Sequence, residues 1–152
     1  MVRFIDIAPR LGLAALFGLA LAIGPARAER AGVVGAWFTE DGNGVVAIEP
    51  CGDALCGRIV GIVRSPRDPI PKDVHGDSQC GLTIIREERP TGDGAWLGKV
   101  TDPRDGTTYR ARLWLDPMGN LRVRGFLVLP LLGQTQTWRP FSGRVTAACE
   151  VA

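Results

Sequence analysis

The sequence has few of the residues on which catalysis usually depends. Its 152 residues include one histidine, one tyrosine and three serines. A nucleophilic serine or cysteine needs a base within reach, and there is no G-x-S-x-G motif and no glycine cluster of the phosphate-binding kind. His75 and Ser78 share one loop, but closeness in sequence is weak support for a dyad. We therefore expect a protein that is not an enzyme, with no catalytic residue and no cofactor.

An excess of charge of one sign is also missing. The full chain has a formal net charge of +2, and the part after residue 28 has equal numbers of basic and acidic residues. Nucleic acids and anionic membrane surfaces are bound through clustered positive charge. The composition therefore predicts no nucleic-acid partner and offers no electrostatic reason to expect membrane binding.

Long hydrophobic runs are absent except near the N-terminus. Leu11–Ile23 carries no charge, follows two arginines and precedes an Ala-Arg-Ala sequence that ends at Ala28. This pattern predicts a cleaved secretory signal peptide over residues 1–28, since a membrane-spanning helix needs about 20 apolar residues. We expect residues 29–152 to form one exported domain without stable membrane insertion.

From Gly32 onward the chain alternates between short strand-like stretches and turns. Twenty glycines and eleven prolines argue against a helical bundle. β-branched and aromatic stretches recur about every ten residues, which is the spacing of a β-sandwich or β-barrel. The expected strands are Gly32–Thr39, Gly44–Pro50, Leu55–Val63, Cys80–Glu87, Ala95–Thr101, Thr107–Leu115, Leu121–Leu129 and Gln134–Pro140.

Four cysteines lie in the exported part, at positions 51, 56, 80 and 149. An even number of cysteines in an exported protein indicates disulfides, and four permit three pairings. We favour Cys51–Cys56, which spans a hairpin turn short enough for the two ends to meet. For Cys80, in an apolar run, the alternative is a buried free thiol. The irregular spacing and the single histidine predict no zinc or other metal site.

The hairpin from Thr107 to Leu129 has two different faces. A five-residue turn that pairs Leu115 with Leu121 sets the register. The other expected pairs are Leu113–Val123, Tyr109–Leu127, Arg112–Arg124 and Trp114–Arg122. Facing arginines repel unless acids, solvent or an anion separate them, so this Arg-rich hairpin presents either a solvated exterior, which we favour, or an anion-binding surface.

The segment from Arg64 to Gln79 is longer than most connections between strands. It contains three prolines and the only histidine. Two interpretations remain open for it: a functional rim over one end of the domain, or a solvated loop without a special role.

Gly35-Ala36-Trp37 lies in the first expected strand and Thr137-Trp138-Arg139 in the last. These two motifs resemble those of the calycins, the superfamily of lipocalin-like up-and-down barrels. The resemblance implies an eight-stranded antiparallel barrel in which Trp37 closes one end beneath Arg139. A guanidinium can stack on an indole in this way.

A closer resemblance covers residues 33–141. Its motifs are Gly35-Ala-Trp-Phe-Thr-Glu-Asp41, Cys51-Gly-Asp-Ala-Leu-Cys-Gly-Arg-Ile-Val60, Cys80-Gly-Leu82, Trp96-Leu-Gly98, Asp102-Pro103, Leu121-Arg-Val-Arg-Gly125 and Gly133-Gln-Thr-Gln-Thr-Trp-Arg139. Together they resemble the DUF2147 family of small exported bacterial proteins, whose function is not known. The resemblance implies a periplasmic protein with a calycin-like barrel.

The polar stretch Gln134–Trp138 suggests a function for the barrel interior. If Thr135 and Thr137 point inward with Tyr109, their hydroxyls supply the few polar groups of a small-molecule site. The alternative is ordinary alternation along a strand, with no further meaning. The leading hypothesis is therefore non-enzymatic binding of a small, partly apolar ligand inside the barrel. The competing hypothesis is an envelope interaction or structural module with a solid barrel, acting through the Arg-rich hairpin or the 64–79 loop on a partner that the sequence does not identify.

Overall fold

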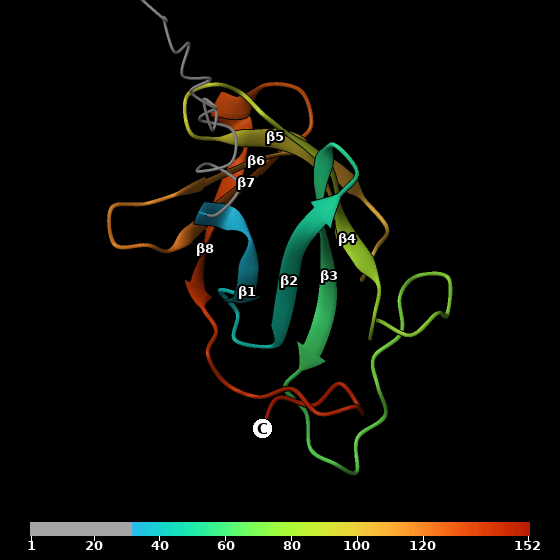
Figure 1. The fold of residues 1–152 in the computed structure, drawn as a ribbon. Coiled ribbons are helices and arrows are strands. Elements are labelled where there is room, and N and C mark those ends of the chain that lie inside the picture. The colour runs from blue at the N-terminus through green and yellow to red at the C-terminus, as the bar shows by residue number, and fades with distance from the viewer. Residues whose placement is uncertain (1–31) are drawn as a thin grey trace, which may run out of the picture.

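The computed structural model describes residues 32–152, and the expected signal peptide lies outside the described residues. Eight strands form a closed barrel in which each strand is antiparallel to its neighbours (Figure 1). The strands are β1 (Gly35–Phe38), β2 (Gly44–Cys51), β3 (Ala54–Ile62), β4 (Thr83–Pro90), β5 (Trp96–Thr101), β6 (Thr108–Leu115), β7 (Leu121–Phe126) and β8 (Gln134–Pro140). A short 3-10 helix, η1 (Pro130–Leu132), lies between β7 and β8. The predicted eight-stranded antiparallel barrel is confirmed.

The expected strand from Cys80 begins three residues late, at Thr83. The preceding residues form a turn in which the Leu82 N–H donates to the Gln79 carbonyl at 3.2 Å. Gly81 has φ of 83° there, a conformation that glycine adopts at little cost. The apolar stretch that begins at Cys80 was therefore correctly identified, but its first three residues belong to the turn before β4 and not to the strand.

The hairpin of β6 and β7 has the expected register. Four expected pairs are present: Leu115–Leu121, Leu113–Val123, Arg112–Arg124 and Trp114–Arg122. The expected Tyr109–Leu127 pair is wrong, because β7 ends at Phe126 and not at Leu129. The chain leaves the sheet after Phe126, and Pro130, which has no N–H to offer a strand ladder, begins η1.

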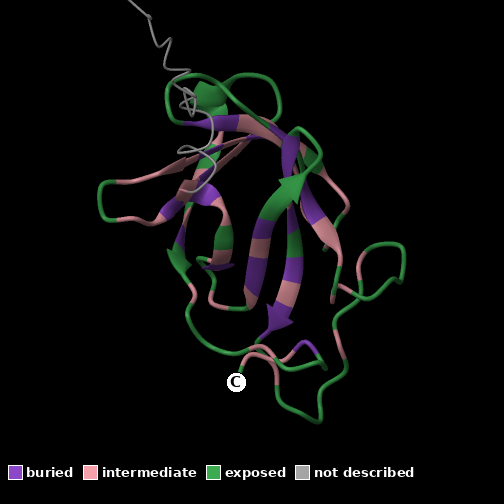
Figure 2. Cartoon of the chain, in the orientation of Figure 1, coloured by how far each residue is buried: buried purple, intermediate pink, exposed green. Residues whose placement is uncertain are grey.

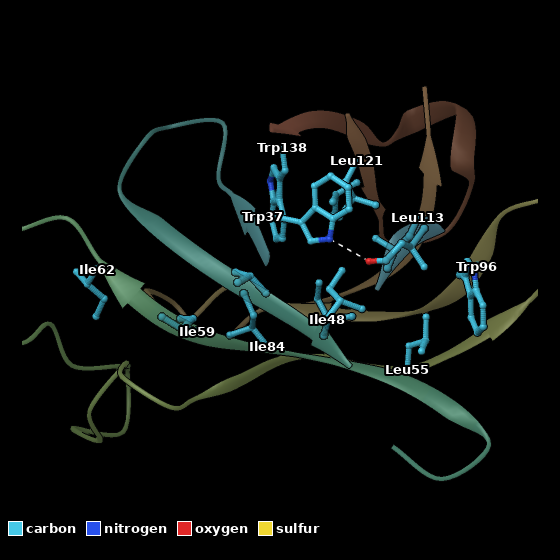
Figure 3. Close-up of a cluster of buried hydrophobic side chains, with 14 of the residues drawn as sticks. Trp37, Ile48, Leu55, Ile59, Ile62, Ile84, Trp96, Leu113, Leu121 and Trp138 are labelled. Atoms are coloured by element: carbon cyan, nitrogen blue, oxygen red, sulfur yellow. Dashed lines mark hydrogen bonds between the residues drawn. The ribbon is translucent and has the colours of Figure 1, made fainter. Parts of the chain in front are cut away.

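Buried apolar side chains form a core cluster inside the barrel (Figure 3), and Figure 2 shows that the strands carry most of the buried residues. Trp37, Trp96 and Trp138 come from three different strands and are each at most 5% exposed. The Trp37 indole N–H donates to the Val33 carbonyl at 2.9 Å. Their neighbours in the cluster include Val46, Ile48, Leu55, Ile59, Ile62, Ile84, Ile85, Leu113, Leu121 and Val123. An eight-stranded barrel holds either side chains or one small ligand, and here side chains occupy it.

Both disulfides are present, and all four cysteines are used. Cys51–Cys56 joins the end of β2 to β3 with Cα atoms 5.8 Å apart, which confirms the favoured pairing. Cys80–Cys149 joins the loop before β4 to the C-terminal segment, with Cα atoms 6.0 Å apart. The free-thiol alternative for Cys80 is therefore wrong.

The long loop between β3 and β4 is tied down along its length. Arg64 forms an ion pair with Glu150 at 2.9 Å and donates to the Asp68 carbonyl at 2.7 Å. The Val74 N–H donates to the Pro103 carbonyl at 3.1 Å. Figure 1 shows this loop and the C-terminal segment at the same end of the barrel, as the second disulfide requires.

Candidate functional site

Two of the three residues predicted to line the interior lie outside the barrel. Thr135 and Thr137 pair with Arg124 and Arg122, and the Thr135 hydroxyl accepts a hydrogen bond from Arg124 Nη1 at 2.7 Å. The prediction failed because Trp138 points inward, where it is only 3% exposed. Alternate residues of a strand face opposite sides, so an inward Trp138 turns both threonines outward.

Tyr109 does lie on the inner side of its strand. It shares the face of Ala111 and Leu113, which are both fully buried. Gly125 lies beside it, since a Cβ at Gly125 would be 3.6 Å from the Tyr109 Cβ, an ordinary contact distance. Because Tyr109 is separated from both threonines by the wall of the barrel, the three hydroxyls do not form one site.

The predicted closing pair of Trp37 and Arg139 is also wrong as a contact. Arg139 pairs with Phe38, and its guanidinium carbon lies 5.8 Å from the centre of the Phe38 ring. Trp37 is the residue before Phe38 and therefore faces the opposite side, into the core. The cation–aromatic contact exists, but one residue away and on the outside of the barrel.

Three arginines of the Arg-rich hairpin have polar partners, and the fourth, Arg110, lies over the Phe126 ring. Arg112 pairs with Asp93 at 2.6 Å, and Arg122 lies 4.0 Å from Asp116. Arg124 donates to carbonyl groups of the loop before β8. These partners separate the facing cations, so the favoured interpretation, an exterior face, agrees with the structure.

Glu88 on β4 is a buried acid that the sequence analysis missed. It is 0% exposed, and neither carboxyl oxygen has a hydrogen-bond partner among the described residues. Burial raises the pKa of Glu88 to about 9, so the carboxyl group is protonated at neutral pH. A Cβ at Gly98 on β5 would lie 2.7 Å from the Glu88 carboxyl carbon, so the acid occupies the space that this glycine leaves.

A β-bulge directs Glu88 inward. The β4–β5 register shifts between Arg86 and Arg89, and Glu87 has φ of 59°. Glu87 is thereby turned outward, where Lys99 pairs with it at 2.8 Å. The sequence feature that could have revealed this buried acid is the pair Glu87-Glu88, because adjacent residues of a strand face opposite sides and one of the two must face inward.

A second unpartnered polar group lies in the same interior. The indole nitrogen of Trp96 is buried and has no hydrogen-bond partner among the described residues. Buried polar groups without partners are uncommon and costly, at about 1–3 kcal/mol each. Together with Glu88, this indole distinguishes the interior from a purely apolar core.

Two pockets stand out on the described part of the chain, and neither is the closed interior. The larger, about 510 Å³, lies where β5 begins and β6 ends. Its walls are Gly32, Val33, Asp93, Gly94, Ala95, Arg112, Trp114 and Leu115. We call it the rim pocket. The smaller, about 330 Å³, lies between Phe38 and the C-terminal segment.

The rim pocket combines an apolar wall with an ion pair. Ala95, Trp114 and Leu115 contribute apolar surface to its lining, and the Asp93–Arg112 pair contributes charged groups. The Thr91 hydroxyl and the Arg112 guanidinium lower the pKa of Asp93 to about 2, so this carboxylate is ionised at every physiological pH. The pocket can therefore hold a molecule with an apolar body and a polar group.

His75 and Ser78 do not form a catalytic dyad, and no metal site is found in the described residues. His75 and Ser78 make separate local contacts: the His75 N–H donates to Asp73, and the Ser78 hydroxyl accepts from the Cys80 N–H. Within residues 32–152, no group of three or more histidine, cysteine or acidic side chains is placed to hold a metal ion. No helix in that same range is long and apolar enough to cross a membrane.

A closed barrel with a Trp-rich interior is the architecture of a lipocalin-like protein. The solved protein HP1028 from Helicobacter pylori, described as belonging to the lipocalin family, shares this fold. It is 19% identical, the match covers 72% of this chain and 83% of that one, and the TM-score is 0.62. The chain itself belongs to the family described as uncharacterised proteins conserved in bacteria, DUF2147, whose model matches residues 35–139. No curated protein shows a significant match to the chain.

Proposed function

We propose that this protein is a periplasmic, non-enzymatic binder of a small, partly apolar molecule, and that the molecule binds in the rim pocket. The observation that carries this proposal is the pocket itself, whose volume of about 510 Å³ lies in the range of small-molecule sites. The lipocalin-like fold supports it, since eight-stranded barrels of this kind include ligand carriers.

The pocket replaces the interior as the proposed site. The interior is filled by the tryptophans and their aliphatic neighbours, and two of the three predicted interior hydroxyls lie outside. The end of the barrel at Trp114 and Leu115 is open to solvent and retains an apolar wall. A ligand that enters there needs no rearrangement of the core.

The chemistry of the pocket limits the ligand. The Arg112 side chain is 38% exposed, so its guanidinium remains accessible to a ligand while it pairs with Asp93. Guanidinium groups bind carboxylates and other planar acceptors well. We therefore infer an amphipathic ligand, with an acceptor group at Arg112 and an apolar part against Trp114.

Native mass spectrometry of the mature protein, purified from periplasm and incubated with a periplasmic small-molecule extract, tests the proposal. We expect a discrete added mass that is lost on denaturation and is reduced at least about tenfold by Trp114→Ala. Arg122→Ala is the matched control, because Arg122 is the cross-strand neighbour of Trp114 and does not line the pocket. The proposal is contradicted if the protein shows no added mass after incubation, or if the Trp114→Ala variant carries the adduct to the same extent as the natural protein. Cell fractionation tests the periplasmic location separately.

A second function, as a module that acts through its outer surface, is favoured by a different observation. The arginines of the hairpin are engaged with partners, and the loop after β3 is tied to the C-terminal segment. The connection between β7 and β8, in contrast, exposes large apolar side chains. This connection is the surface feature that favours a function through the outside of the barrel.

A further inference from the structure

Residues 127–132, which we call the apolar loop, expose large hydrophobic side chains to solvent. The exposed residues are Leu127, Val128, Leu129, Leu131 and Leu132, at between 55% and 86% of their full surface. Figure 2 shows the helical turn of this loop, η1, as exposed. Soluble monomers seldom present such a contiguous group unless it makes contact with something.

Other exposed apolar residues of the described chain do not form such a group. Val63, Val74 and Met118 are exposed too, but Val63 and Val74 are well separated within the connection between β3 and β4, and Met118 lies in the turn between β6 and β7. Single exposed hydrophobic residues are ordinary on protein surfaces. The apolar loop is therefore a distinct feature and not part of a generally apolar surface.

Part of the backbone of the apolar loop, around Pro130–Leu132, is hydrogen-bonded within the protein. Arg124 on β7 donates through Nε to the Pro130 carbonyl at 2.7 Å and through Nη2 to the Leu131 carbonyl at 3.2 Å. The Leu132 N–H donates to the Leu129 carbonyl at 3.0 Å, and the Pro130 nitrogen carries no hydrogen. A backbone can enter a medium without water only if its polar groups are paired in this way.

Arg124 also fixes the shape of the loop. The same guanidinium donates to the Thr135 hydroxyl at 2.7 Å, so one side chain connects the loop to both β7 and β8. Because its polar atoms are bound at its base, the loop presents its hydrophobic side chains outward in one arrangement. Little conformational entropy remains to be lost when they are buried.

The charges around the loop suit a phosphate-bearing surface. No acidic residue occurs between Asp116 and Glu150, a stretch that contains both β7 and β8. β6 contains none either. The Arg110 guanidinium lies 5.4 Å from the centre of the Phe126 ring, next to the start of the loop. The acids of other segments contact these strands elsewhere, Asp93 at Arg112 and Glu40 at the Thr137 N–H, and no ion pair to Arg110 is found in the described residues.

We propose that the apolar loop docks this protein reversibly on a lipid bilayer, with its leucines at the boundary of the headgroups and acyl chains and Arg110 beside a phosphate. A single six-residue loop offers less contact surface than the roughly 800 Å² per partner of a stable protein dimer. It matches the shallow insertion of peripheral membrane anchors. The mature chain has no net charge, so the binding depends on apolar insertion and changes little with salt concentration.

Vesicle flotation with the mature protein tests this proposal. We expect the protein to float with vesicles of phosphatidylethanolamine and phosphatidylglycerol at both low and high salt. The double variant Leu131→Asp/Leu132→Asp should lower the bound fraction at least about tenfold, because each aspartate would have to leave water. Met118→Asp is the matched control, since Met118 is 83% exposed in the turn before β7, and it should float as the natural protein does.

A second readout places the loop in the lipid directly. In a Leu132→Trp variant we expect acyl-chain bromination to quench the added fluorescence relative to the natural protein. The proposal is overturned if the natural protein does not float, if the double aspartate variant floats equally, or if bromination changes nothing. It is also overturned if sedimentation shows a dimer that the aspartate variant dissociates, because the loop would then bind a second copy. Circular dichroism melting establishes that each variant is folded.

Discussion

Replacing Glu88 by glutamine removes the only fully buried acid of the described chain while keeping its size. The pKa of this carboxyl is about 9 in the folded protein, compared with 4.5 for an exposed glutamate. Between these two pH values the folded state holds a proton that the unfolded state has lost. The free energy of unfolding of the natural protein therefore falls as pH rises, by about 1.4 kcal/mol per pH unit.

From pH 5 to pH 8 this slope amounts to about 4 kcal/mol, a large part of the 5–15 kcal/mol that stabilises a typical domain. In Glu88→Gln the amide does not titrate, and this contribution disappears. We expect the natural protein and the variant to have similar stability near pH 5, and the variant to be increasingly the more stable of the two as pH rises. Urea unfolding at each pH, with both disulfides intact, measures the difference.

Glu87→Gln is the control for this experiment. Glu87 is the neighbouring residue, but it is exposed, and its interaction with Lys99 lowers its pKa. A lowered pKa in the folded state adds stability at pH values above the pKa of the unfolded state, and this added stability is lost only as pH falls. Glu87→Gln should therefore show the same fall in the free energy of unfolding between pH 5 and 8 as the natural protein. Parallel stability curves for Glu88→Gln and the natural protein would refute the reasoning, because they would mean that the carboxyl ionises at its ordinary pKa in the fold.

Further predictions concern the packing and the disulfides. Gly98→Ala should lower the free energy of unfolding by about 1–3 kcal/mol, because a Cβ there would lie 2.6 Å from a carbonyl oxygen of β4; an unchanged melting temperature would contradict the packing described. Replacing Cys80 and Cys149 by serine should cost about 4 kcal/mol, since that bridge closes a loop with a sequence separation of 69. The same replacement at Cys51 and Cys56, separated by 5, should cost only about 2 kcal/mol, and equal losses of urea midpoint for the two pairs would contradict the loop-length argument.

Features with short-range signals could be predicted from the sequence. Alternation of apolar and polar residues and regular turn spacing located the strands, and the turn before Leu121 set the register of β6 and β7. Cys51 and Cys56 are held close by the turn between them, so their pairing followed from spacing. The family motifs predicted the barrel, and a family model that matches residues 35–139 confirms them.

The candidate site was predicted less well, because the two faces of β8 were assigned the wrong way round. The alternation of Gln134–Trp138 is compatible with either face inward, and only the packing of Trp138 against Leu121 distinguishes them. Because alternate residues face opposite sides, an inward Trp138 means that Thr135 and Thr137 lie on the outside. The rim pocket is lined by residues that are far apart in the sequence and has no local pattern. The apolar loop is a continuous run of sequence, but only the structure shows that its side chains are exposed.

The sequence by itself determined the number of strands, their order and the local disulfide, because each depends on residues within one hairpin or one turn. Only the tertiary structure decided which face of each strand points inward, where Glu88 lies, and that Cys80 meets Cys149. These features require the barrel to close, and closure brings together strands that share no local contact in the sequence. The filled interior has the same origin, since the space inside a barrel depends on all of its inward side chains together.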